Sequence, residues 1–141
     1  MIVLDTNVIS ALIQGVPDPA VVQWLNAQPG NSVWTTAISV FESRFGFARL
    51  PAGHKRQALQ AAFNRALAQM GNQVLNFDTD AANETAAIAA KLEAAGRTID
   101  FRDAMIAGIV AARGGTLATR NTRHFADAEI PLINPWQSGP P

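Results

Sequence analysis

The chain has 141 residues, of which 48% are hydrophobic and 16% charged, and its formal net charge is zero. This length fits one domain with one core, and no apolar run approaches the ~20 residues that a membrane span needs. Asp5 interrupts the first apolar run and no basic segment precedes it, so no signal peptide is expected. Because cysteine is absent, disulfides and thiolate metal sites are excluded, and a cytoplasmic location is expected.

The zero net charge hides a separation of charge along the chain. The first 43 residues hold three acids and no Lys or Arg, whereas the stretch from Ser43 to Phe77 holds five basic residues and no acid. A negative site beside a positive surface would suit a metal-bound phosphodiester and its flanking phosphates. The alternative is that these charges lie on the solvated faces of amphipathic helices.

The first half of the chain alternates short strands with helices. The expected elements are a strand at 2–4, a helix capped by Asn7 that runs to about Ile13, a helix that starts with Asp18-Pro19 and spans 21–25, a strand at 32–35, a helix capped by Thr36 and ended by 50–53, and a helix from about His54 to Met70. On the helix after Thr36, one apolar stripe contains Ile38, Phe41, Phe45 and Ala48.

The second half continues the alternation. It predicts a strand at 74–77, a helix over 81–95 capped by Asp78 or Thr79, a helix over 101–113 closed by two glycines, a strand at 116–119 and a last short strand at 131–134. Short strands separated by helices predict a parallel sheet with helices on both faces, which is a three-layer α/β/α fold. One domain is expected over residues 1–136, followed by a short tail over 137–141.

Three acids stand out from their apolar surroundings. Asp5 directly follows the first strand, and ligands of open α/β sheets bind outside the carboxyl ends of the strands. Glu42 lies within an apolar helical stretch, and Asp103 heads another. The competing explanations are a helix cap at Asp5, a solvated helix surface at Glu42 and a partner of the helix dipole at Asp103.

Carboxylates that share a pocket cannot all stay ionised unless a cation neutralises them. Oxygen ligands without Cys, and with His54 and His124 too isolated for a zinc motif, favour Mg²⁺ or Mn²⁺. Asp100, three residues before Asp103, either shares a helix face with it or caps the helix. The order of the acids therefore predicts an acidic metal pocket.

Five short segments in this order resemble one family. They are Ile2-Val3-Leu4-Asp5-Thr6-Asn7-Val8-Ile9-Ser10, Ser39-Val40-Phe41-Glu42 followed by Arg44-Phe45-Gly46, Asp103-Ala104-Met105-Ile106-Ala107, Ala118-Thr119-Arg120-Asn121-Thr122-Arg123-His124-Phe125 and Asn134-Pro135-Trp136. Together they resemble the PIN-domain ribonucleases, specifically the VapC/FitB-like toxins of type II toxin–antitoxin modules, over essentially the whole chain. The resemblance implies a small α/β/α fold, endonucleolytic RNA cleavage, a homodimer and a cognate antitoxin.

The resemblance also implies which residues act. Asp5, Glu42 and Asp103 match the three acids that bind Mg²⁺ or Mn²⁺, and a metal-activated water would cleave the RNA. Asn121 stands at a fourth position that is often Asp. Because its oxygen is neutral, we expect one well-occupied metal in the free protein and a second only with substrate.

Residues around the acids are assigned supporting roles on the same grounds. Thr119 is expected to orient a ligand or water, and Asp100 either supports the site or caps its helix. Arg44, Arg120 and Arg123 are expected to contact RNA phosphates. Exposed Phe and Ala stripes on the early helices are the expected docking faces for the antitoxin, with an ordinary core role as the alternative.

Three other functions compete with the nuclease. An Asp-dependent phosphohydrolase of the haloacid dehalogenase type would place a second Asp where this chain has Asn7. A phosphorylated receiver domain would need a Lys after a late strand, and neither Lys55 nor Lys91 is so placed. A non-catalytic PIN-fold binding module stays open, because Asn121 weakens the acidic set.

Overall fold

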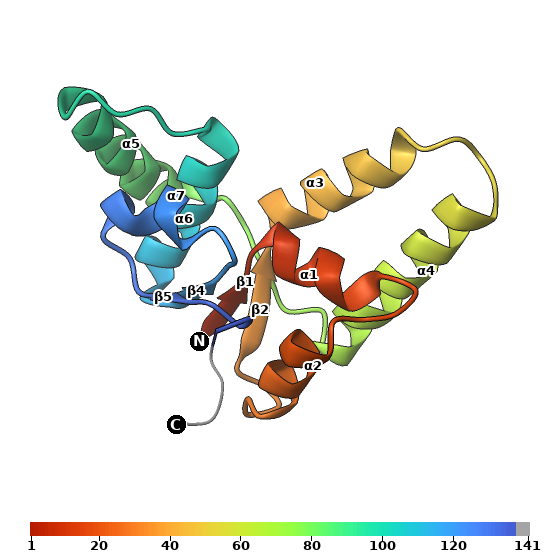
Figure 1. Ribbon diagram of the computed structural model, residues 1–141. Helices are drawn as coiled ribbons and strands as arrows, with labels where there is room; N and C mark the ends of the chain where they lie inside the picture. Colours follow the sequence, from red (N-terminus) through yellow and green to blue (C-terminus); the bar gives the residue numbers. More distant parts are fainter. Residues whose placement is uncertain (138–141) are drawn as a thin grey trace.

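The computed structural model describes residues 1–137, in which a five-stranded parallel sheet carries helices on both faces (Figure 1). The strands are β1 (Ile2–Leu4), β2 (Val33–Thr36), β3 (Val74–Leu75), β4 (Thr116–Ala118) and β5 (Leu132–Ile133). They are hydrogen-bonded in the order β3-β2-β1-β4-β5, and each neighbouring pair is parallel. The three-layer α/β/α prediction is therefore confirmed.

The helices follow the predicted order. They are α1 (Thr6–Ile13), α2 (Pro19–Asn26), α3 (Ala37–Ala48), α4 (His54–Gln69), α5 (Thr79–Ala94), α6 (Phe101–Arg113) and the short α7 (Thr122–Phe125), which continues into a 3₁₀ turn at Ala126–Ala128. Among residues 1–137, no helix is long and apolar enough to cross a membrane. Of the predicted tail, 138–141 lie outside the described residues, so the domain boundary stays a prediction.

Two local predictions were wrong, and one short helix was not predicted. Asp5, and not Asn7, caps α1, because its carboxylate accepts the Thr6 N–H at 2.8 Å. The helix α7, which follows β4, was not predicted because it has only four residues. β3 ends at Leu75, two residues earlier than expected, and Asp78 then caps α5.

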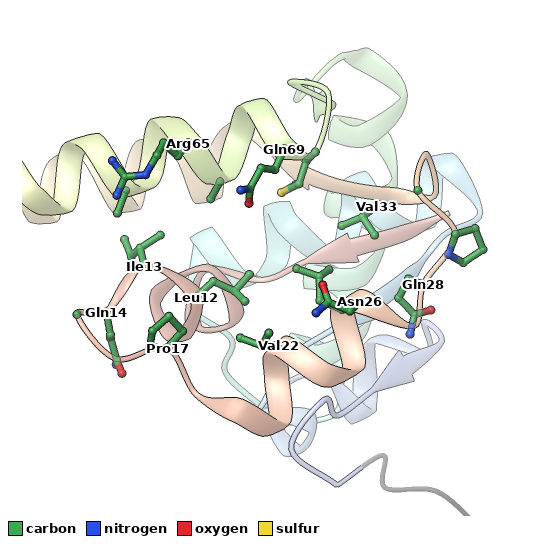
Figure 2. A pocket seen from close by; sticks show the side chains of 17 residues that line it. Leu12, Ile13, Gln14, Pro17, Val22, Asn26, Gln28, Val33, Arg65 and Gln69 are labelled. Atoms are coloured by element: carbon green, nitrogen blue, oxygen red, sulfur yellow. The ribbon is translucent and has the colours of Figure 1, made fainter.

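Alternate side chains of the central strands belong to two hydrophobic cores, because successive side chains of a strand point to opposite faces of the sheet. Leu4 of β1 and Ala118 of β4 pack with α1, α2 and α4, where Phe63 is fully buried. This layer also contains a hollow of about 700 Å³ between α1, α2 and the end of α4 (Figure 2). We call it the apolar hollow; Leu12, Val22 and Met70 are among the residues that line it.

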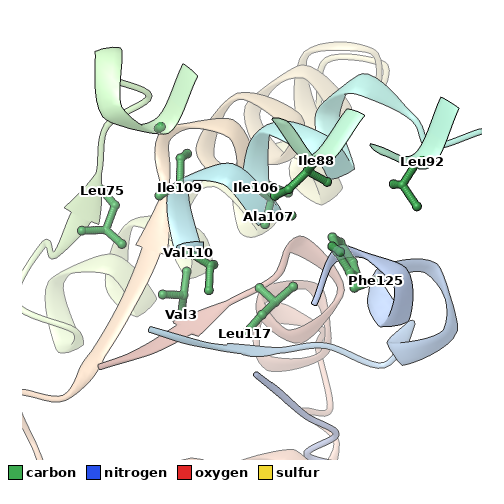
Figure 3. Packing of buried hydrophobic residues seen from close by; sticks show 12 residues of the cluster. Val3, Leu75, Ile88, Leu92, Ile106, Ala107, Ile109, Val110, Leu117 and Phe125 are labelled. Atoms are coloured by element: carbon green, nitrogen blue, oxygen red, sulfur yellow. The ribbon is translucent and has the colours of Figure 1, made fainter. Parts of the chain in front are cut away.

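On the other face, Val3 of β1 and Leu117 of β4 pack with α5 and α6 (Figure 3). Gly108 allows α5 and α6 to approach closely: a Cβ at this position would lie 1.9 Å from Thr85 Oγ1 and 2.8 Å from the Ala81 carbonyl oxygen. α6 is therefore held tightly against α5, and its first turn is fixed relative to the ends of β1 and β4.

The helices α3 and α4 extend away from the sheet as a pair (Figure 1). Phe47 packs edge-on against Phe63, with ring centroids 5.6 Å apart, and holds the two helices together. Phe41 and Phe45, expected on an apolar stripe, are 54% and 46% exposed. The expected stripe is therefore partly a surface, because a helix that leaves the sheet has too little core to cover its whole apolar face.

Candidate metal centre

The order of the strands places the site. The chain moves from β1 through β2 to β3 on one side, and then returns to put β4 on the other side of β1. The carboxyl ends of β1 and β4 thus form a topological switch point, where ligands of open α/β sheets bind. Asp5 directly follows β1, and Thr119 directly follows β4.

Asp5 is buried at this point, with 5% of its surface exposed. One oxygen, Oδ1, accepts the Thr6 N–H at 2.8 Å, and the other, Oδ2, accepts the Thr119 hydroxyl at 2.7 Å. Asn7 Nδ2 lies 3.4 Å from Oδ2. Both carboxylate oxygens are therefore held in fixed positions by neighbours in the chain and across the sheet.

The charge of Asp5 is nevertheless opposed by its surroundings. Burial raises the pKa of Asp5 to about 6, against the lowering effect of the hydrogen bonds from Thr119 and Thr6, and the charges of Asp103 and Glu42 raise it further. Hydrogen bonds alone thus leave part of the negative charge uncompensated. A carboxylate of this kind in a folded protein is a candidate for function.

Thr119 joins the ends of the two strands through a single hydroxyl. While it donates to Asp5, its oxygen accepts from Asn7 Nδ2 at 3.3 Å and from the Asn121 N–H at 3.0 Å. The side-chain oxygen Oδ1 of Asn7 in turn accepts the Arg120 N–H at 3.2 Å. This arrangement uses the hydroxyl proton entirely on Asp5, so Thr119 orients that carboxylate and has no proton to give to another group.

Glu42 reaches the same region from α3. The helix starts at a Thr36 cap, whose hydroxyl accepts the Ser39 N–H at 3.0 Å, and Glu42 lies one turn after Ser39 on the same face. Its Oε1 accepts the Thr6 hydroxyl at 2.9 Å, and the Thr6 oxygen also lies 3.0 Å from Ser39 Oγ. Thr6 thereby links Asp5 and Glu42, which are the acids after β1 and β2.

Asp103 comes from the first turn of α6. Burial raises the pKa of its carboxyl group, and the charges of Asp100 and Glu42 add to that effect. His124 Nδ1 of α7 lies 4.0 Å from Asp103 Oδ2. The acid thus lies between the Glu42 side of the site and α7.

Asp100 caps α6 and also binds an arginine. Its carboxylate accepts the Arg102 N–H at 2.8 Å, and the Arg102 guanidinium lies 3.2 Å away through Nε. These hydrogen bonds hold the pKa of Asp100 below its ordinary value. Arg102 Nη1 also lies 3.7 Å from Glu42 Oε2. The cap considered for Asp100 is thus confirmed, whereas its support of the site stays a prediction.

A second hollow, of about 530 Å³, adjoins Asp103. We call it the α7 hollow; its lining includes Asp100, Asp103, Arg123 and His124. Within residues 1–137, Arg123 makes no hydrogen bond or ion pair. Of the arginines expected to contact RNA, Arg123 thus lies beside an acid of the site, and its guanidinium makes no such contact of its own.

Other expected site residues lie at its edge. Arg44 donates to Asn64 at 3.0 Å and its guanidinium lies 5.0 Å from the centre of the Phe63 ring, so it is committed to the α3–α4 pair. The Arg120 guanidinium lies 4.8 Å from the centre of the Trp136 ring. Asn121 contributes its backbone N–H to Thr119, while its side chain is exposed and makes no hydrogen bond within residues 1–137.

The acids do not yet converge on one point. Within residues 1–137, no three His, Cys, Asp or Glu side chains stand close enough together to hold a metal ion as they lie. The hydroxyl of Thr6 binds Glu42 instead, and the guanidinium of Arg102 binds Asp100 and lies near Glu42. The sequence indicated no role in the site for Thr6, Ser39 or His124; the hydroxyl residues that follow the strands were the signal available for the first two.

Comparisons with known proteins find relatives over nearly the whole chain. The model of the family described as PIN domain matches residues 2–130. The VapC ribonuclease Y4jK of Sinorhizobium fredii is 41% identical over 97% of this chain and 99% of that protein. Toxin FitB of Neisseria gonorrhoeae is 34% identical over 96% of this chain and 99% of that protein.

Solved structures show the same fold. In the crystal structure of FitAcB from Neisseria gonorrhoeae, one chain superimposes with a TM-score of 0.88 at 35% identity, over 97% of this chain and 99% of that one. A chain of VapBC-5 from Mycobacterium tuberculosis, a member of the VapBC family of toxin–antitoxin systems, gives a TM-score of 0.70 at 26% identity, over 94% and 96% of the two chains.

Proposed function

We propose that this chain, which belongs to the PIN-domain family, is a divalent-metal-dependent endoribonuclease and the toxin of a toxin–antitoxin pair. One observation carries the proposal above the others. At the switch point of the sheet, burial raises the pKa of Asp5 to about 6, and the charges of Asp103 and Glu42 add to that effect. The similarity to a VapC ribonuclease and to Toxin FitB supports the choice of activity and role.

The residues present fit a hard divalent cation. The donors are carboxylate oxygens without a sulfur ligand, which favours Mg²⁺ or Mn²⁺ over softer ions. Mg²⁺ is usually bound through a few carboxylates, with water and substrate phosphate completing its shell, so the acids need not all converge beforehand. We assign the ion to Asp5, Glu42 and Asp103, with Asn121 beside them as a neutral oxygen donor.

The bound ion would lower the pKa of a water molecule and offset negative charge on the phosphate. In the hydrolysis, a water oxygen replaces one ribose oxygen on phosphorus, and the proton from water ends on the leaving oxygen. Asp5 is held for this work by Thr6 and Thr119, since their hydrogen bonds fix both its oxygens. The neighbouring Arg120 and Arg123 supply positive charge for flanking phosphates.

The alternatives find less support in the geometry. A phosphohydrolase of the haloacid dehalogenase type would use Asp5 as a nucleophile and would need a second acid two residues later. Asn7 stands at the position of that second acid, and its side-chain amide donates to Thr119 and accepts the Arg120 N–H. A binding module without catalysis would not need uncompensated charge at the switch point.

The experiment is cleavage of a mixed-sequence RNA by the purified chain with Mg²⁺ or Mn²⁺, and again with EDTA. We expect cleavage that EDTA abolishes, together with a higher melting temperature in saturating Mn²⁺, since a ligand at about 100 times its Kd adds about 2.7 kcal/mol to stability. RNA that stays intact with either ion would contradict the nuclease and favour the binding module.

The proposed partner is an antitoxin, by analogy with FitAcB and the VapBC system. We place its docking face on the exposed side of α3, where the rings of Phe41 and Phe45 lie with centroids 5.7 Å apart. Phe41→Ser with Phe45→Ser should leave cleavage intact and abolish its inhibition by the co-expressed antitoxin.

The homodimer and the cytoplasmic location expected from the sequence stay predictions. Light scattering at micromolar concentration tests the homodimer.

A further inference from the structure

Arg102 connects acids that come from two different helices. Its guanidinium lies 3.2 Å from Asp100 Oδ1 at the start of α6 and 3.7 Å from Glu42 Oε2 on α3. The hydrogen bond to Asp100 and the charges of Asp100 and Glu42 raise the pKa of Arg102 above its ordinary value, and the charge of Asp103 adds to that effect. A permanent positive charge therefore stands at the edge of the three carboxylates to which we assign the metal.

The two contacts of the guanidinium are unequal. Asp100 binds it through Nε at 3.2 Å and Nη2 at 3.5 Å, and also accepts the backbone N–H of Arg102 at 2.8 Å. The distance of 3.7 Å from Nη1 to Glu42 is too long for a hydrogen bond. Asp100 thus anchors one edge of the guanidinium, while Nη1 keeps its N–H groups free on the side of Glu42.

The geometry points to Arg102 as a catalytic residue that binds the scissile phosphate, with Asp100 as its positioning residue. The assignment rests on the proposed ribonuclease function. Arginine binds phosphate through a planar fork of N–H groups, and here the free part of that fork faces the acids. The side chain of Arg102 is 49% exposed, so a phosphate can reach it. Donors fixed before the reaction are effective where negative charge grows in the transition state.

A second Asp–Arg pair at the other end of α6 provides a matched control. Arg113 pairs with Asp78, which caps α5 just as Asp100 caps α6. Within residues 1–137, Arg113 forms no ion pair with any other acid. The two pairs share their chemistry and their capping role, and they differ in whether the arginine faces the site.

The first test compares Arg102→Gln, Arg102→Lys and Arg113→Gln. Single-turnover cleavage of a mixed-sequence RNA in saturating Mn²⁺ gives the rate, and titration calorimetry gives Mn²⁺ affinity without RNA. For Arg102→Gln we expect a rate about 100-fold lower and Mn²⁺ binding about threefold tighter, because a nearby positive charge is removed. Arg102→Lys should lose about tenfold in rate, since it keeps the charge but not the fork. Arg113→Gln should change neither.

The second test separates positioning from capping. Asp100→Asn keeps a good helix cap but removes the charge that holds Arg102. We expect a rate about tenfold lower with Mn²⁺ affinity unchanged within about twofold, whereas Asp78→Asn should leave the rate unchanged. Cleavage by Asp100→Asn at the wild-type rate would show that Asp100 is a cap alone and would overturn its positioning role.

The outcomes distinguish this assignment from the proposed function. Wild-type protein that cannot cleave RNA overturns both. EDTA-sensitive cleavage by the wild type, with Arg102→Gln equally active, overturns the assignment of Arg102 alone. A slow Arg102→Gln variant that also binds Mn²⁺ tenfold more weakly overturns it too, because Arg102 would then act by holding Glu42 for the metal. If circular dichroism shows Arg102→Gln unfolded, the rates of Arg102→Lys and Asp100→Asn decide.

Discussion

The apolar hollow and the acidic site at the ends of β1 and β4 are built in different ways. The hollow is the larger cavity, at about 700 Å³, and Arg65 is the charged residue in its lining (Figure 2). A large apolar pocket is the usual first choice for a binding site. The acidic site instead contains a carboxylate whose pKa is raised by burial, with the charges of neighbouring acids adding to that effect. In this protein, uncompensated charge at the switch point indicates function better than volume does.

The most direct test of this comparison removes a charge from the acidic site and a polar side chain from the apolar hollow. Asp5→Asn, Glu42→Gln and Asp103→Asn should each lower RNA cleavage roughly a thousandfold, because each removes part of the several kcal/mol that a held metal supplies to the transition state. Gln69→Ala, which changes the lining of the apolar hollow, should leave the rate within about twofold. Circular dichroism should show all four variants folded.

An acid variant that folds and keeps full, EDTA-sensitive cleavage would exclude that residue from the site. A Gln69→Ala variant that loses cleavage while its melting temperature stays unchanged would mean that the hollow takes part in the reaction, and the comparison above would fail.

The second prediction concerns stability. Removing the charge of Asp5 should stabilise the metal-free protein, although it lowers cleavage. Because the folded pKa of Asp5 is about 6 and its ordinary value is 3.8, the metal-free protein should lose stability as pH rises from about 4 to 6. Asp5→Asn cannot ionise, so at pH 7 it should be more stable than the metal-free wild type by about 1–3 kcal/mol. Urea unfolding in EDTA at pH 4 and pH 7 measures the difference.

At pH 4 the advantage of Asp5→Asn should nearly vanish, since most of the wild-type carboxyl is then protonated when folded. Saturating Mn²⁺ should reverse the order at pH 7, because the ion binds the wild type and not the variant. Equal stability of the two proteins at pH 7 in EDTA would show that hydrogen bonds from Thr119 and Thr6 already compensate the charge.

A third test compares two buried threonines. Thr119 donates to Asp5 at 2.7 Å, and Thr35 of β2 donates to the Leu4 carbonyl at 2.9 Å; both are fully buried. Replacing either by Val leaves a buried acceptor without its donor and should lower stability by about 1–3 kcal/mol. Thr119→Val should also lower cleavage 10- to 100-fold, roughly the effect of losing a group that orients a metal ligand.

Thr35→Val should cleave at a rate within about twofold of the wild type, measured at a temperature where both variants are folded. A similar loss of activity in the two variants would indicate that stability, and not the orientation of Asp5, controls the rate.

The sequence predicted the fold from local patterns, and missed what depends on contacts between distant segments. Thr36, Asp78 and Asp100 precede the helices that they cap, so the order of elements could be predicted. The exposure of Phe41 could not be predicted in this way, because it depends on how far α3 extends beyond the sheet.

The links within the site are also non-local. Thr6 meets Glu42 across 36 positions, and Asp5 meets Thr119 across 114. A pattern shows that acids follow strands, but it does not show which strands are neighbours. Arg102 is the clearest case, since its spacing from Asp100 was visible while its approach to Glu42 required the packing of α3 against α6.

The smallest effect is expected at Asn121, whose exposed side chain makes no hydrogen bond within residues 1–137. Its backbone N–H holds Thr119, and any side chain preserves that contact. Asn121→Ala should therefore lower cleavage by less than about tenfold, well below the loss for an acid.

Asn121→Asp adds a negative charge near Asp5 and should tighten Mn²⁺ binding in titration calorimetry, because carboxylates bind hard cations better than amides. Since three carboxylates balance one divalent ion, the wild type without RNA should show one tight site, and the Asp variant a second. Two equally tight sites in the RNA-free wild type would contradict this charge balance and would mean that the neutral side chain of Asn121 is no barrier to a second ion.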